Sequence, residues 1–199
     1  MRKLLMIGSI LILGITAFAG VESDIINGNG EAKMTVGSRG IATDGTTAGK
    51  LIVTPIHNAG QDGASLEFNF NDLVRGKSQK SMASFKAEVV NESGELATLE
   101  DSNVEVKLQK VEIGTSGNST ITDKGNVITG IEIKNANSEK LGTLAYEITS
   151  NRINNSGKTL EVEVVSTVDI DDAEYTGNFM DESMRISIAV KNLNSPTWN

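Results

Sequence analysis

Most of the chain alternates between apolar and polar residues with a period of two, which is the pattern of a β-strand with one buried face. Only residues 72–85 are compatible with a helical turn. The alternating segments are residues 32–36, 50–55, 65–70, 84–90, 103–114, 126–134, 141–150, 160–170 and 183–192. The pattern therefore predicts an all-β protein of eight or nine strands.

Short segments rich in Asn, Asp, Ser and Gly separate the predicted strands, for example residues 91–95 (NESGE) and 154–158 (NNSGK). Gly adopts positive φ without strain, and Asn and Asp hydrogen-bond their own backbone, so such segments favour tight turns. A hairpin is expected over residues 151–160, and a β-bulge near Gln109 and Lys110, where the alternation changes phase. Many strands joined by short turns predict an antiparallel β-sandwich.

The N-terminus has the three parts of a secretory signal peptide. Arg2 and Lys3 precede an apolar run over residues 4–15, and a small-x-small site ends at Ala19. We therefore expect residues 1–19 to be a signal peptide that is cleaved between Ala19 and Gly20. A spanning helix needs about 20 apolar residues, and no second apolar run follows. The sequence predicts no membrane span after cleavage.

The net charge and the absence of cysteine limit the classes of protein to which the chain can belong. The 199 residues include 18 Lys and Arg against 26 Asp and Glu, for a net charge of −8, and no basic stripe is visible. Nucleic-acid binding is therefore not expected, because it requires clustered cations. The chain contains no cysteine, so a secreted form must be stable without disulfides. This favours a larger β-sandwich or a subunit stabilised by its neighbours.

The sequence offers little for catalysis or metal binding. His57 is the single histidine and lies in a polar context, so no cysteine or serine nucleophile with a histidine base is indicated. Asp169, Asp171 and Asp172 are weak candidates for calcium ligands, but their spacing does not match an EF-hand loop. We expect no cofactor and no enzymatic activity.

The C-terminal segment Ala173–Val190 (AEYTGNFMDESMRISIAV) resembles the last strand of bacterial fimbrial subunits, where a Y-x-G turn leads into an alternating strand. The signal peptide and the strand predicted at residues 32–36 extend the resemblance. The chain is most similar to cysteine-free pilins, the major subunits of colonisation-factor fimbriae of the chaperone-usher type. It departs from them in continuing past the last strand with LNSPTWN.

This resemblance implies an immunoglobulin-like sandwich over residues 41–199 that lacks one strand. An N-terminal extension, residues 20–40, would complete the next subunit by strand donation, with Ala32, Met34 and Val36 as the inserting side chains. The implied partners are other copies or related subunits, a periplasmic chaperone and usher, and a host or cell-surface receptor. The implied location is a fimbria at the cell surface, reached through the periplasm.

Period-two alternation does not identify the partner of a strand, so residues 32–36 are also compatible with an ordinary first strand of their own sheet. The alternative function is then a monomeric secreted binding module for a carbohydrate or protein ligand. A secreted hydrolase that uses a pair of carboxylates is a weaker third reading, because nothing singles out one pair among 26 acidic residues.

Overall fold

A computed structural model describes residues 21–25, 30–35, 49–61, 63–91, 93–114, 117–171, 175–191 and 193. The expected signal peptide, with Ala19 and Gly20, lies outside these residues. None of the described residues forms a helix, and hence none forms one that could cross a membrane.

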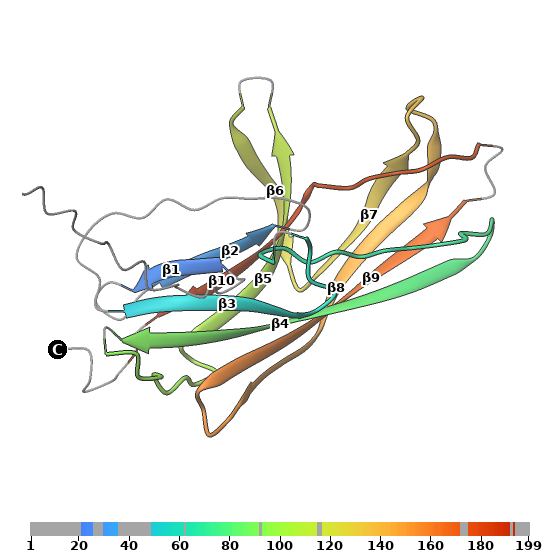
Figure 1. Ribbon diagram of the computed structural model, residues 1–199. Coiled ribbons are helices and arrows are strands. Elements are labelled where there is room, and N and C mark those ends of the chain that lie inside the picture. The colour runs from blue at the N-terminus through green and yellow to red at the C-terminus, as the bar shows by residue number, and fades with distance from the viewer. Residues whose placement is uncertain are drawn as a thin grey trace, which may run out of the picture.

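Two antiparallel sheets make up the molecule (Figure 1). The six-stranded sheet has the order β1-β3-β4-β9-β8-β7 and the four-stranded sheet the order β2-β10-β5-β6. The strands are β1 (Val21–Ile25), β2 (Gly30–Thr35), β3 (Gly49–His57), β4 (Ser78–Asn91), β5 (Val104–Ile113), β6 (Ser119–Gly125), β7 (Val127–Lys134), β8 (Lys140–Asn154), β9 (Thr159–Ile170) and β10 (Met184–Val190). The predicted all-β, antiparallel sandwich is confirmed.

Local predictions fare unevenly. The hairpin expected over residues 151–160 joins β8 to β9. The β5–β6 pairing shifts register between Lys110 and Val111, next to the predicted bulge, but the unpaired residue is Thr122 on β6. The strand predicted over residues 65–70 is wrong, because this segment forms only an isolated bridge between Leu66 and Ala59.

The helical turn considered for residues 72–85 is also absent, since β4 begins at Ser78. Two short strands were not predicted. These are β1, over the sequence VESDI, and β6, over STITDKG. Neither segment has an apolar residue at every second position, which is the signal that found the other strands.

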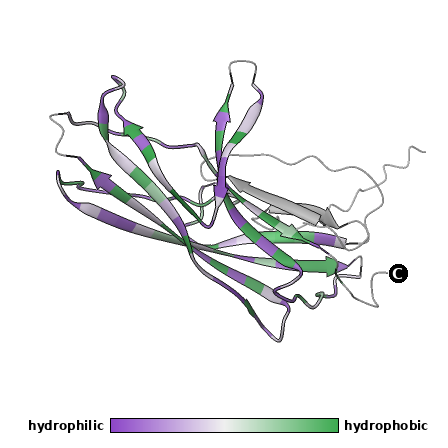
Figure 2. Ribbon diagram, turned by 180° about the vertical axis from the view of Figure 1, so that it is seen from behind, coloured by the Kyte–Doolittle hydropathy of each residue, from purple (hydrophilic) through white to green (hydrophobic). Residues whose placement is uncertain are grey.

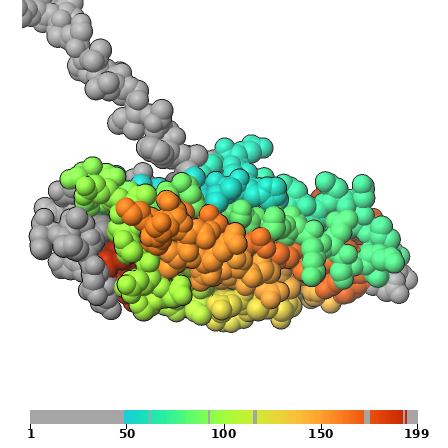
Figure 3. All heavy atoms as spheres, turned by 90° about the horizontal axis from the view of Figure 1, so that it is seen from below, coloured from blue at the N-terminus to red at the C-terminus, as the bar shows by residue number. Residues whose placement is uncertain are grey.

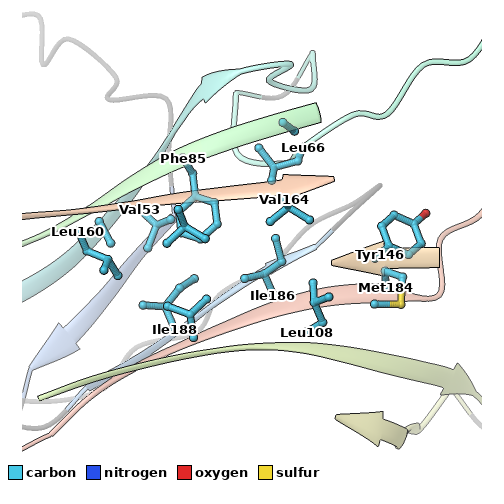
Figure 4. Packing of buried hydrophobic residues seen from close by; sticks show 14 of the residues in the cluster. Val53, Leu66, Phe85, Leu108, Tyr146, Leu160, Val164, Met184, Ile186 and Ile188 are labelled. Atoms are coloured by element: carbon cyan, nitrogen blue, oxygen red, sulfur yellow. The ribbon is translucent and has the colours of Figure 1, made fainter. Parts of the chain in front are cut away.

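The core lies between the sheets and follows the alternation that Figure 2 shows along the strands. Inward positions on β4 and β9 meet those of β5 and β10, and Figure 4 shows the centre of this cluster. Its largest fully buried side chains are Phe85, Leu51, Leu66, Leu108, Ile128, Leu144, Leu160, Met184, Ile186 and Ile188. Burial of this apolar surface is the main favourable term in folding.

The layer that packs against the six-stranded sheet, here called the second layer, is a sheet along only part of the sandwich. Where the four-stranded sheet stops, residues 63–77 and 175–183 run as extended segments beside the six-stranded sheet (Figure 1). Asn135, in the β7–β8 turn, holds the later segment, because its Nδ2 donates to the Thr176 carbonyl oxygen at 2.9 Å. A Cβ atom on Gly177 would lie 2.9 Å from Cβ of Asn135, so the segment packs closely on this turn.

Among the described glycines, Gly142 leaves the least room for a Cβ atom, and we expect Gly142→Ala to destabilise the fold. An added Cβ would lie 2.0 Å from the Asp169 carbonyl oxygen, which belongs to the backbone and has little room to move. We expect a loss of about 3 kcal/mol in the free energy of unfolding, as for severe overpacking. Urea denaturation followed by circular dichroism measures it.

Gly125→Ala is the matched control, since its Cβ would lie 3.4 Å from the nearest atom, the Val127 carbonyl oxygen. This variant should stay within about 0.5 kcal/mol of the wild type. A Gly142→Ala protein as stable as the wild type would show that β8 and β9 lie farther apart than described.

Candidate functional site

The two N-terminal strands close one side of the sandwich. β1 pairs antiparallel with β3, placing Val21 opposite Val53 and Ile25 opposite Gly49. β2 pairs antiparallel with β10, on the other sheet. β1 and β2 also lie against each other, so one short stretch of chain covers an edge of both sheets.

The edges beneath these strands lie directly over the core. Leu51 and Val53 on β3, and Ile186 and Ile188 on β10, are 0% exposed. Without β1 and β2, the backbone groups on the outer sides of β3 and β10 would have no strand partner. An uncovered edge of this kind recruits other strands, so this side of the molecule is the candidate assembly site.

The predicted donor residues fall partly within this site. Ala32 is the register partner of Ile188, and Met34 is the register partner of Ile186. Val36 lies outside the described residues. In the single chain β2 pairs within its own fold, which is the ordinary arrangement that the alternation also allowed.

The calcium candidates form no metal site among the described residues. Asp171 forms an ion pair with Lys140, with a shortest Nζ–Oδ2 distance of 2.8 Å, and this hydrogen bond raises the pKa of Lys140. Asp169 accepts a hydrogen bond from Ser78 Oγ, and Asp172 is not described. No group of three or more acidic or histidine side chains in the described parts of the chain is arranged so that it could hold a metal ion. His57 is exposed at the end of β3.

A second feature, which the sequence analysis missed, is a groove between the two extended segments. Residues 66–70 form one wall and residues 179–182 the other, over Leu144 and Tyr146 of β8. The groove has a volume of about 360 Å³. Three carboxylates line it, from Glu67, Asp181 and Glu182, with no Lys or Arg, while Leu66, Phe68, Phe70 and Phe179 supply apolar surface.

Tyr146 fixes the groove to the sheet. Its side chain is 3% exposed and lies beside Met184, with the hydroxyl directed away from the core (Figure 4). The hydroxyl donates to Asp181 Oδ2 at 2.9 Å, and Asp181 Oδ1 accepts from Ser183 Oγ at 2.7 Å. The Phe68 ring meets Tyr146 edge to face, with centroids 5.6 Å apart. The Tyr146 side chain therefore contacts both walls of the groove, one through a hydrogen bond and the other through ring packing.

Burial of this phenol raises the pKa of Tyr146, and the nearby charge and hydrogen bond of Asp181 raise it further. The hydroxyl consequently keeps its proton, and its hydrogen bond to Asp181, across the neutral range. The alternation of residues 141–150 predicts only that Tyr146 shares one face of a strand with Leu144 and Ile148. The aromatic alternation of residues 66–70 was the one available signal, and it was interpreted as sheet pairing.

Comparison of the chain with protein-family models, curated proteins and solved structures finds no match.

Replacing Tyr146 with Phe should lower the free energy of unfolding by about 2 kcal/mol at neutral pH, because a buried hydrogen bond to a charged group is lost. Tyr175→Phe is the control, since Tyr175 is 50% exposed. Guanidinium titrations of both variants measure the difference. Equal stability of the Tyr146→Phe variant and the wild type would show that the hydroxyl does not hold the segment.

Alkaline pH should separate the same variants. The folded pKa of Tyr146 lies above its unfolded value of about 10, so its contribution is fully present below pH 10 and is lost as pH rises above it. Wild type and Tyr175→Phe should therefore lose stability faster than Tyr146→Phe between about pH 9 and pH 11. Parallel curves for all three proteins would contradict the assignment.

Proposed function

We propose that this protein is a secreted structural subunit of a bacterial surface filament of the fimbrial type, which assembles by strand complementation and serves adhesion. The observation that carries the proposal is that residues 21–35 supply an edge strand to both sheets at once, β1 on β3 and β2 on β10. The signal-peptide pattern of residues 1–19 supports secretion.

The length of chain that follows this segment favours exchange between copies. Residues 36–48 join β2 to β3, and a connection of this length spans up to about 40 Å when extended. It is long enough for the same two strands to reach a neighbouring copy. Backbone hydrogen bonds would supply the affinity, and alternate side chains of the donated strand would supply the specificity.

The groove favours a second candidate function. A hollow of about 360 Å³ with an apolar floor and three carboxylates is the kind of surface that binds a ligand. If β2 stays in its own sheet, the protein is better described as a monomeric secreted β-sandwich binding module. The two functions differ in one property, which is whether β2 and β10 belong to the same copy.

Because the chain lacks cysteine, an engineered disulfide can decide this. Thr35 and Arg185 are register partners, and directly opposed residues of antiparallel strands have Cα atoms roughly 4.5–5.5 Å apart, which suits a disulfide. We expect the Thr35→Cys, Arg185→Cys protein, oxidised after assembly, to run as a covalent ladder on a non-reducing gel.

The control pair is Glu147→Cys with Val165→Cys, register partners within the β8–β9 hairpin. This variant should give only an internal crosslink, seen as an unchanged mass. If the Thr35–Arg185 pair also closes only within one chain at every protein concentration, strand donation is wrong and the binding module becomes the better description.

A further inference from the structure

Next to the groove lies the densest basic cluster among the described residues. Arg75, Lys77 and Lys80 fall within six positions, and every residue from Val74 to Lys80 is exposed. We name residues 74–80 the basic tip. No ion pair between described residues includes its three cations. In Figure 3 one end of the molecule is formed largely by teal-green residues, the colour range in which the tip lies.

The backbone holds the tip in a fixed shape. Lys77 N donates to the Val74 carbonyl oxygen at 3.1 Å, and Gly76 adopts a positive φ of 62° in this turn. Gly76 N also donates to the Ile170 carbonyl oxygen at 3.0 Å, which anchors the turn to β9. Val74 is 58% exposed. The tip therefore presents an exposed apolar side chain beside cations, on a backbone that loses little conformational entropy on binding.

The groove has the opposite chemistry. Its floor is apolar, its three carboxylates have no lining cation beside them, and an adjoining hollow that shares Phe68, Phe70 and Phe179 adds Asp72. The best complement to this surface is an apolar side chain flanked by cations. Cations can also lie over the phenylalanine faces, which attract positive charge.

The tip adjoins the groove, because residues 66–70 form a groove wall, Asp72 and Leu73 line the adjoining hollow, and the tip begins at Val74. A surface with an acidic half beside a basic half complements itself when a second copy is related to it by a two-fold axis. We propose that two copies of this chain dock in this way, each inserting Val74, Arg75 and Lys77 into the groove of the other.

This contact is independent of strand complementation. Strand exchange joins copies through the side of the sandwich that β1 and β2 close, whereas tip and groove join them through the opposite half of the molecule. It is also electrostatic, so salt should weaken it, because exposed charges are screened at high ionic strength. Pairing through backbone hydrogen bonds and apolar burial lacks this salt dependence.

Charge reversal tests the proposal with two variants of the full chain. The tip variant is Arg75→Glu with Lys77→Glu, and the groove variant is Glu67→Lys with Glu182→Lys. Each variant places like charges together at both contacts of the dimer, so each should weaken the dimer at least about tenfold. In a mixture, opposite charges meet again at both contacts, and a heterodimer should form. Sedimentation velocity at about 0.02 M and about 0.5 M salt measures this.

Lys124→Glu with Lys158→Glu changes the net charge as much as the tip variant does, on other elements, and should leave the dimer unchanged. Three results would overturn the proposal. These are a wild type without salt-sensitive association, a dimer that both reversals leave intact, and a mixture that forms no heterodimer. Binding of an added arginine-rich peptide without self-association would also overturn it and make the groove a peptide site.

Discussion

The fold depends on covering two open strand edges that lie on the same side of the sandwich. β3 and β10 each border the core, and each needs a partner for its outer backbone groups. Residues 21–35 provide both partners. A protein without cysteine has no covalent means of holding this side closed, so closure depends on backbone pairing and on burial beneath it.

The other half of the sandwich is organised differently. Here the second layer consists of two extended segments, held by side chains and a few isolated backbone hydrogen bonds instead of a continuous ladder. The Tyr146–Asp181 hydrogen bond and the hold of Asn135 on Thr176 fix the later segment in place. Incomplete pairing leaves a groove where a continuous sheet would leave none. The same architecture therefore has one side closed by strand pairing and another side with a groove between unpaired segments.

Alternation identified the strands that have one buried face, such as β9, whose residues Leu160, Val162 and Val164 all point into the core. It failed where a residue is buried without belonging to a strand, and where a paired strand is exposed on both faces. Leu66 is fully buried in a segment that forms only an isolated bridge, so the alternation there resembles that of a strand, whereas β6 is paired but mostly exposed and shows no alternation. The groove depends on Tyr146 meeting Asp181 from a distant segment, and no local pattern encodes such a contact.

The pairing of β2 with β10 has a consequence for the order of folding. Met34 and its register partner Ile186 are about 150 residues apart in the chain, and contacts between such distant residues form slowly because a large loop must close first. During synthesis β2 is made long before β10 exists. The newly made chain therefore passes through an interval in which β1 can already pair with β3 while β2 still has no partner.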